Sequence, residues 1–124
     1  MQDFKKLKVW QKSHTLAVAV YECTRAFPKE ELYGLTSQMR RASVSISANI
    51  SEGCGRDTAN EYLHFLQIAK GSASELENYL LLCNAIGFLS TEETDRLQSL
   101  LTEFQKMLFA MLKKLRNNTS TTNL

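Results

Sequence analysis

The chain has 124 residues, of which 44% are hydrophobic and 23% are charged, and its formal net charge is +2. This length allows one domain with a buried core. No apolar run approaches the roughly 18 residues of a membrane span, and the lysine-rich start is not followed by the apolar stretch of a secretory signal. We therefore expect a cytoplasmic protein without membrane contact, and the small net charge alone does not argue for nucleic-acid binding.

The three cysteines are Cys23, Cys54 and Cys83, an odd set without regular spacing. This pattern is typical of reduced thiols in a cytosol rather than of a disulfide framework. Because no Cys-x-x-Cys pair occurs, the sequence does not indicate a zinc site. Cys23 and Cys83 fall on apolar stripes and are predicted to be small core residues. Cys54 lies between two glycines, a position that favours exposure.

The first predicted helix covers residues 8–27 and ends at Pro28, the only proline. Residues 28–33 form the first connection. Residues 16–21 are six consecutive apolar residues, which cover the whole circumference of a helix, whereas a surface helix of a monomer needs one apolar stripe. We therefore predict that the middle of this helix is buried on more than one side, either as a central core helix or at a contact between subunits.

The second predicted helix covers residues 35–52, and its pattern is the least ordinary in the chain. Residues 42–51 alternate strictly between apolar and polar, which locally is typical of a half-buried strand. No second strand candidate exists in the sequence, and a lone strand cannot satisfy its own backbone. We therefore predict a helix of small residues that is held by its neighbours rather than by propensity. Its apolar face follows helical spacing: Leu35, Met39, Ala42, Ile46 and Ile50.

Two further residues of this helix carry specific expectations. Gly53 is predicted to be its C-terminal stop. Asn49 lies near the apolar stripe, where a buried amide needs hydrogen-bond partners and can fix the register of neighbouring helices.

The third predicted helix begins at Thr58, where Thr58 and Glu61 have the spacing of a capping box, and it continues to about residue 86. A run of small residues at 71–74 interrupts its apolar stripe. Because glycine at Gly71 costs about 1 kcal/mol relative to alanine, we expect a close helix crossing or a bend there. The stripe consists of Tyr62, Phe65, Leu66, Ala69, Ala73, Leu76, Leu80 and Cys83.

The fourth predicted helix begins at Ser90, which forms a second capping box with Glu93. Residues 117–124 are polar and predicted to be a disordered tail, so the predicted domain covers residues 1–116. The apolar residues of this helix form a heptad seam: Leu97, Leu101, Phe104, Leu108, Met111 and Leu115.

Four amphipathic helices with short connections predict an all-α, antiparallel up-down-up-down four-helix bundle. This topology gathers the start of the first helix, the second turn and the end of the fourth helix at one end. That end carries eight basic and four acidic residues, a net +4, whereas the opposite end carries −3 and the middle +1. The basic residues are Lys5, Lys6, Lys8, Lys12, Arg56, Lys113, Lys114 and Arg116.

The basic end has two interpretations. Clustered lysines raise the local potential and attract phosphate backbones without sequence preference, which makes these eight residues candidates for nucleic-acid binding. Alternatively, the cations favour the C-terminus of the last helix and keep the N-terminal segment solvated.

Patterns that could support catalysis or a cofactor are incomplete. Glu61 and His64 have the Glu-x-x-His spacing of half a di-metal site, but the other histidine, His14, has no matching glutamate. The serines lack a His-Asp arrangement. Residues 53–56 precede a helix N-terminus that suits anions, yet their glycine spacing matches no phosphate loop, and we interpret them as a turn. We therefore expect no enzyme activity, metal, cofactor or small-molecule substrate.

Arg40 and Arg41 are adjacent and point about 100° apart on their helix. At most one of them can face a core. We expect one arginine to pair with a carboxylate across a subunit boundary, either Glu52 or Glu75, and the other to meet solvent or RNA.

A series of short motifs occurs in a fixed order between residues 4 and 116, and together they resemble a known family. They are Val9-Trp10-Gln11-Lys12, Phe27-Pro28, 33–38, Arg40-Arg41, Ser45-Ile46, 47–53, Gly55-Arg56, 69–72 and 75–77. The chain resembles the four-helix bundle proteins encoded within intervening sequences of bacterial 23S rRNA genes, which are related to the accessory protein of diversity-generating retroelements. It departs from this family at Ser47, where the family commonly has a proline that would kink the second helix.

The resemblance implies a homopentameric ring of bundles and a partner that is RNA, a ribonucleoprotein or a reverse-transcriptase-type protein. It also implies subunit packing through motif residues Arg40, Arg41, Asn49, Glu52 and Gly53. Family members have no established catalytic activity. Our leading hypothesis is a non-enzymatic ring that binds RNA through its basic end. The alternatives are a protein-assembly scaffold without nucleic-acid contact and a metal-dependent bundle enzyme.

Overall fold

The computed structural model describes residues 2–122, with side chains as far as residue 118. It contains two short 3₁₀ helices, η1 (Phe4–Lys6) and η2 (Lys29–Glu31), and four α-helices. The α-helices are α1 (Lys8–Thr24), α2 (Leu35–Cys54), α3 (Ala59–Ala85) and α4 (Thr91–Thr122). No strand occurs among these residues, so the prediction of an all-α chain with four helices is confirmed.

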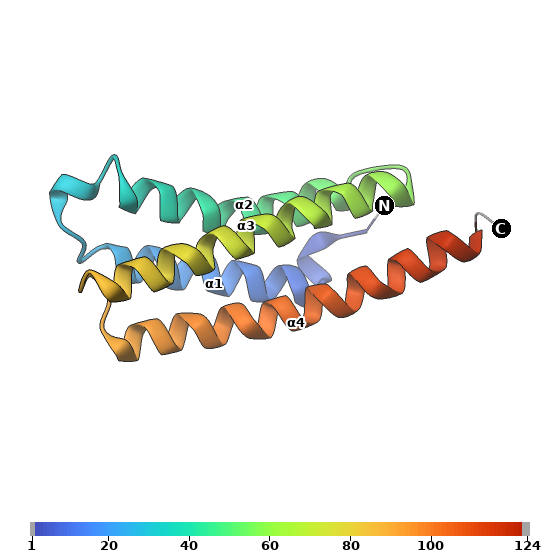
Figure 1. The fold of residues 1–124 in the computed structure, drawn as a ribbon. Helices are drawn as coiled ribbons and strands as arrows, with labels where there is room; N and C mark the ends of the chain where they lie inside the picture. The colour runs from blue at the N-terminus through green and yellow to red at the C-terminus, as the bar shows by residue number, and fades with distance from the viewer. Residues whose placement is uncertain (1, 123–124) are drawn as a thin grey trace.

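The four helices lie alongside one another (Figure 1). α1 packs against α2 and α4, and α3 packs against the same two helices. In the view of Figure 1, the start of α1, the turn between α2 and α3 and the last turns of α4 lie toward the right, and the other two connections lie toward the left. Three segments that are far apart in the sequence therefore approach one end of the molecule.

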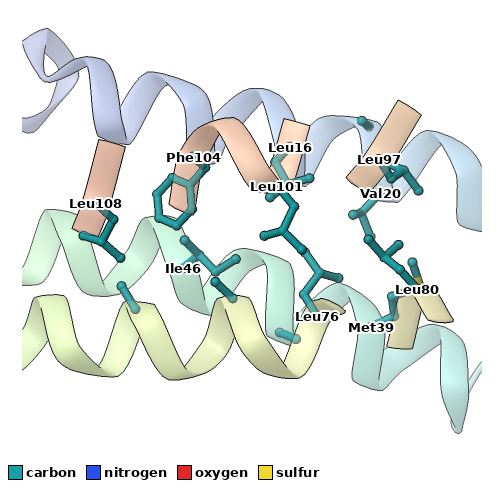
Figure 2. Close-up of a cluster of buried hydrophobic side chains, with 14 of the residues drawn as sticks. Leu16, Val20, Met39, Ile46, Leu76, Leu80, Leu97, Leu101, Phe104 and Leu108 are labelled. Atoms are coloured by element: carbon teal, nitrogen blue, oxygen red, sulfur yellow. The ribbon is translucent and has the colours of Figure 1, made fainter. Parts of the chain in front are cut away.

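The core runs along the middle of the molecule and takes side chains from all four helices. Each of the labelled side chains in Figure 2 is fully buried, and they point toward one another between the helices. Burial of such a side chain contributes about 1.5–3 kcal/mol, so this shared core holds the helices together. The labelled residues are Leu16, Val20, Met39, Ile46, Leu76, Leu80, Leu97, Leu101, Phe104 and Leu108.

The alternating segment 42–51 lies inside α2 and is helical, as predicted. Val44 belongs to the apolar half of the alternation, yet it is exposed. The alternation therefore does not define a face, because the backbone has a helical rather than a two-residue period. α2 continues through Ser47, whose Oγ donates a hydrogen bond to the Val44 carbonyl at 3.2 Å. The buried side chains of the segment include Ala42, Ile46 and Ile50.

The prediction that the first helix reaches residue 27 is wrong, because α1 ends at Thr24. Thr24 Oγ1 donates to the Val20 carbonyl at 2.8 Å, and the Phe27 N–H donates to the Thr24 carbonyl at 3.1 Å. These bonds replace the continuing α-helical pattern with a turn. A proline also disfavours the helical conformation of the residue before it, so the chain leaves the helix before it reaches Pro28.

The prediction that Gly53 stops the second helix is also wrong, because α2 includes Gly53 and ends at Cys54. The glycine serves packing instead. A β-carbon at residue 53 would lie 3.0 Å from Tyr62 Cδ1 and 3.1 Å from Phe65 Cβ. Gly53 therefore allows the end of α2 and the start of α3 to approach closely.

The close crossing expected at Gly71 occurs one residue later. Gly71 is exposed, and a β-carbon added there would meet nothing within 4 Å. Ser72 is buried, and its Oγ lies 2.8 Å from Ser45 Oγ of α2. Two small hydroxyl side chains thus form one of the close contacts between α2 and α3 and share a hydrogen bond there.

The predicted capping box at Ser90 is present in full, and at Thr58 one of its two bonds is found. The Glu61 N–H donates to Thr58 Oγ1 at 3.2 Å. Ser90 and Glu93 bond reciprocally, with the Ser90 N–H on Glu93 Oε1 at 3.1 Å and the Glu93 N–H on Ser90 Oγ at 3.0 Å. These bonds satisfy N–H groups that a helix start leaves unpaired.

The first four members of the α4 heptad seam are fully buried, Met111 and Leu115 are partly buried against the core, and Leu112 beside them is also buried. A straight α-helix drifts about 20° per heptad, which turns the buried stripe toward Leu112 by the third heptad. α4 continues past residue 116 through 117–122 of the predicted tail, and residues 123–124 lie outside the described part of the chain.

Candidate nucleic-acid interface

The predicted basic residues occupy three segments of the structure. Lys5 and Lys6 belong to η1, Lys8 and Lys12 to the first turns of α1, and Arg56 to the turn between α2 and α3. The side-chain amide of Gln11 donates to the Lys5 carbonyl at 2.9 Å and ties η1 to α1. The remaining three lie in the last third of α4: Lys113, Lys114 and Arg116.

A hollow of about 300 Å³ joins these segments. Gln2 of the N-terminal segment, Arg56 and Asp57 of the turn, and Leu115 of α4 all contribute to its lining. Because Leu115 is flanked by Lys114 and Arg116 in the sequence, the hollow brings the end of α4 to the N-terminal segment and the turn. The structure therefore brings parts of the N-terminal segment, the turn and the end of α4 together at one hollow.

Two of the eight basic side chains have carboxylate partners within the chain. Lys12 Nζ lies 2.6 Å from Glu103 Oε1 of α4, and Arg56 pairs with Glu52 at 2.5 Å. Both pairs are solvated, so their contribution to stability is small, but each partner neutralises a cation. Among the described side chains, six of the predicted residues have no salt bridge and are exposed: Lys5, Lys6, Lys8, Lys113, Lys114 and Arg116.

Arg40 is positioned by contacts within its own chain. Its Nε donates to Thr24 Oγ1 of α1 at 2.8 Å, and its guanidinium lies 4.7 Å from the centre of the Tyr21 ring. Arg40 therefore connects α2 to α1. Arg41 is exposed on the same helix, so the two arginines do diverge as predicted.

The other predicted subunit-packing residues also have partners within the chain. Asn49 Nδ2 donates to the Ser45 carbonyl at 2.8 Å and to Ser45 Oγ at 3.1 Å, which extends the Ser45–Ser72 contact. Glu52 holds Arg56, and Glu75 accepts a hydrogen bond from the Tyr79 hydroxyl at 3.2 Å. A role of these side chains between subunits stays a prediction.

Cys54 is buried, with 4% of its surface exposed, so the expectation that it is exposed is wrong. α2 continues past its predicted end at residue 52 to Cys54, which lies beneath Tyr62, whose hydroxyl is 4.0 Å from the Cys54 sulfur. Burial raises the pKa of the Cys54 thiol and of the Tyr62 hydroxyl. The protonated thiol is the unreactive form, so this arrangement does not provide a nucleophile.

Cys23 and Cys83 are buried as predicted, and all three cysteines are unpaired. Burial raises the pKa of Cys83 to about 11. Among the described residues, no group of three or more histidine, cysteine, aspartate or glutamate side chains is arranged to hold a metal ion. None of the described helices combines the length and apolar character needed to cross a membrane.

Sequence reasoning missed a group of residues that the structure assembles beside the turn between α2 and α3. A second hollow, of about 370 Å³, is lined by Arg56, Asn60, Glu61, His64 and Phe65. The Asn60–His64 spacing of four residues places both on one helix face, and this spacing was available in the sequence. The sequence does not show that Arg56 approaches Phe65, at 4.7 Å from the ring centre, because its apolar pattern places Phe65 in the core stripe.

Comparisons with known proteins agree with this fold. No curated protein matches the chain. Among solved structures, the chain is similar to a protein of unknown function from the S23 ribosomal protein family of Bacteroides thetaiotaomicron VPI-5482. The two share 25% sequence identity with a TM-score of 0.79, over 85% of this chain and 98% of that one. The family model of the 23S rRNA-intervening sequence protein matches residues 5–110, which include α1, α2, α3 and most of α4, so the chain belongs to this family.

Proposed function

We propose that the chain is a non-enzymatic, antiparallel up-down-up-down bundle that assembles into a ring and binds RNA, or a ribonucleoprotein, through its basic end. The single observation that carries this proposal is the set of six exposed cations without a salt-bridge partner on η1, α1 and α4. Cations that are not neutralised locally release counterions from a phosphate backbone when they bind it. The family, described by its relation to 23S rRNA genes, makes RNA the natural first candidate.

Two exposed apolar surfaces support assembly. Val18 and Tyr21 are 45% and 40% exposed on α1; Leu82 of α3 is 43% exposed, and Ile86, directly after α3, is 49% exposed. α1 and α3 share the neighbours α2 and α4, so they occupy opposite corners of the bundle. Contacts between two different surfaces of identical subunits are heterologous, and they close into a ring when the rotation allows. The pentamer itself follows from the family resemblance, and light scattering measures the subunit number.

A protein-assembly scaffold in the cytoplasm is the second candidate function. Tyr33, in the connection between η2 and α2, is 92% exposed, and Leu32 beside it is 47% exposed. Exposed aromatic and aliphatic side chains at the acidic end are suited to a protein partner, for example a reverse-transcriptase-type protein. Retention of a protein partner after nuclease treatment, without dependence on salt, supports the scaffold and contradicts RNA binding as the main role.

Charge reversal tests the basic end directly. Replacement of the six exposed cations by glutamate is expected to abolish retention of RNA at low salt, while circular dichroism shows unchanged helicity. The control reverses Arg25, Lys29 and Arg96 at the opposite end and is expected to retain RNA. Unchanged retention by the six-residue variant contradicts the proposal.

A further inference from the structure

The hollow beside the turn between α2 and α3 is a candidate site for a planar ligand. It is lined by Arg56, Asn60, Glu61, His64 and Phe65 and has a volume of about 370 Å³, within the range of small-molecule sites. We call it the Arg56–Phe65 hollow. It adjoins the basic end, because Arg56 also lines the hollow shared with Gln2 and Leu115.

Three planar groups line this hollow. The guanidinium of Arg56 is held on two sides, by Glu52 at 2.5 Å and by the Phe65 ring, whose centre lies 4.7 Å from Arg56 Cζ. The His64 imidazole meets the Phe65 ring edge to face, with centres 5.4 Å apart. Aromatic rings and arginine guanidinium planes are the surfaces on which proteins stack unpaired bases. The Arg56–Phe65 hollow thus has the stacking groups already in place.

Polar groups of two kinds stand beside the stacking groups. Asn60 offers both a carbonyl oxygen and an amide donor, and Glu61 offers a carboxylate that only accepts. The Glu61 backbone N–H donates to Thr58 Oγ1, and among the described residues the Glu61 carboxylate itself has no hydrogen bond or salt bridge. A carboxylate pairs best with a base edge that presents two adjacent N–H donors, which guanine does and uracil does not.

We propose that the Arg56–Phe65 hollow binds one unpaired nucleobase of RNA, preferentially guanine, stacked on its planar side chains and hydrogen-bonded by Asn60 and Glu61. This inference rests on the proposed function of the basic end, whose lysines hold the phosphate backbone. It adds that the RNA is single-stranded at this point. Bases within a duplex are stacked and paired, so they cannot enter a hollow on a protein surface.

Close packing around Gly53 positions this site. The missing side chain at Gly53 lets Phe65 approach α2, which brings its ring beneath Arg56 of the following turn. Four of the five lining residues lie on the first turns of α3, and Arg56 of the turn is tied to α2 by Glu52, which keeps the planar groups in a fixed arrangement.

The first experiment compares a single-stranded oligonucleotide that contains guanine with an RNA duplex of the same length. The double variant Asn60→Ala/His64→Ala removes two exposed side chains of the hollow. Because these groups would contact the bound base, we expect the affinity for the single strand to fall roughly tenfold. Affinity for the duplex and the dependence on salt are expected to stay unchanged. The matched control, Asn78→Ala/His14→Ala, alters exposed residues of the same types outside the hollow and is expected to bind as the wild type does.

Specificity is tested with Glu61→Gln, which keeps the shape of the side chain and removes its charge. The wild type is expected to prefer a guanine oligonucleotide over a uracil oligonucleotide, and the variant is expected to lose that preference. Equal affinity of the wild type for the two oligonucleotides overturns the assignment of guanine. Equal losses for single strand and duplex in the double variant overturn the base site altogether.

A titration with guanosine 5′-monophosphate separates this proposal from the function of the basic end. NMR shifts of the His64 and Asn60 side chains on addition of the nucleotide support the hollow even if the wild type retains no RNA. Retention of duplex RNA without such shifts leaves the basic end as proposed and rejects the hollow.

Discussion

Gly53 of α2 and Phe65 of α3 are packed so closely that a β-carbon at residue 53 would lie 3.1 Å from Phe65 Cβ. The same β-carbon would lie 3.0 Å from Tyr62 Cδ1. This contact joins the two helices at the end of the molecule that carries the candidate site. A methyl group there requires Tyr62 and Phe65 to give way by a few tenths of an ångström, although both are held in the packing of α3 on α2.

Gly53→Ala is therefore expected to destabilise the protein by about 1–3 kcal/mol, the usual cost of overpacking. Gly71→Ala is the matched control, because a β-carbon at Gly71 meets nothing within 4 Å. In a helix interior this control is expected to stabilise by about 0.5–1 kcal/mol. Urea unfolding measures both changes. Equal effects of the two substitutions contradict the close approach at Gly53.

Thr36 and Thr24 are two buried threonines, one with and one without a hydrogen bond to its hydroxyl group, so the same substitution in each is a matched comparison. Thr36 Oγ1 is the one buried side-chain oxygen or nitrogen of the described residues that lacks a hydrogen-bond partner. Thr36→Val removes this unsatisfied group and is expected to leave stability unchanged or raise it by up to about 1 kcal/mol. Thr24→Val removes the oxygen that donates to the Val20 carbonyl and accepts from Arg40, and it is expected to destabilise by about 1–3 kcal/mol. Thermal or urea unfolding that gives the reverse order contradicts this bonding pattern.

Arg40 is expected to affect the stability of the single chain, whereas Arg41 is tested for an effect on the contact between subunits. Arg40→Ala breaks the bond to Thr24 and the stacking on Tyr21, and the expected loss of stability is about 1.5 kcal/mol. Arg41→Ala changes an exposed residue, so the stability of the single chain is expected to change by less than about 0.5 kcal/mol. If Arg41 contacts a neighbouring subunit, its replacement lowers the mass measured by light scattering. An unchanged mass removes Arg41 from the predicted subunit contact.

Cys83 gives the stability a specific pH dependence. Burial raises the pKa of its thiol from 9.0 to about 11, so the folded state holds the proton more tightly than the unfolded state does. The resulting stability is fully present below pH 9 and is lost as the pH rises through 11. Cys83→Ala is expected to make urea unfolding less sensitive to pH in this window. An identical pH dependence in wild type and variant contradicts the assignment to Cys83.

The sequence predicts the helices better than it predicts the contacts between them. Segment 42–51 could be assigned to a helix because no partner strand exists, and the caps at Thr58 and Ser90 follow from local spacing. The sequence predicts a helix stop at Gly53 and a close crossing at Gly71, whereas the close contact lies at Gly53 and nothing approaches Gly71 within 4 Å of an added β-carbon. A helix-internal glycine looks the same in sequence whether or not another helix approaches it, and only the packing of α3 on α2 distinguishes the two.

The difficulty of predicting contacts between helices also explains why the sequence predicts the basic end but not the stacking of Arg56 on Phe65. The gathering of basic residues at one end follows from helix order alone, and the hollow lined by Gln2, Arg56 and Leu115 agrees with it. The stacking of Arg56 on Phe65 depends on the exact rotation of α3 against the turn. A pattern of apolar residues defines such a rotation only to within about one residue position, so Phe65 was assigned to the core.

The dependence of RNA affinity on salt is the measurement that tests the basic end most directly. For a phosphate-binding surface, the logarithm of the affinity falls linearly with the logarithm of the salt concentration, by about 0.7 per neutralised phosphate of a single strand. We expect Lys113→Glu/Lys114→Glu/Arg116→Glu to reduce this slope by about 2, whereas Arg25→Glu/Lys29→Glu/Arg96→Glu, with the same change in charge, leaves it unchanged. Equal slopes in both variants, or an affinity of the wild type that does not vary with salt, would contradict the account.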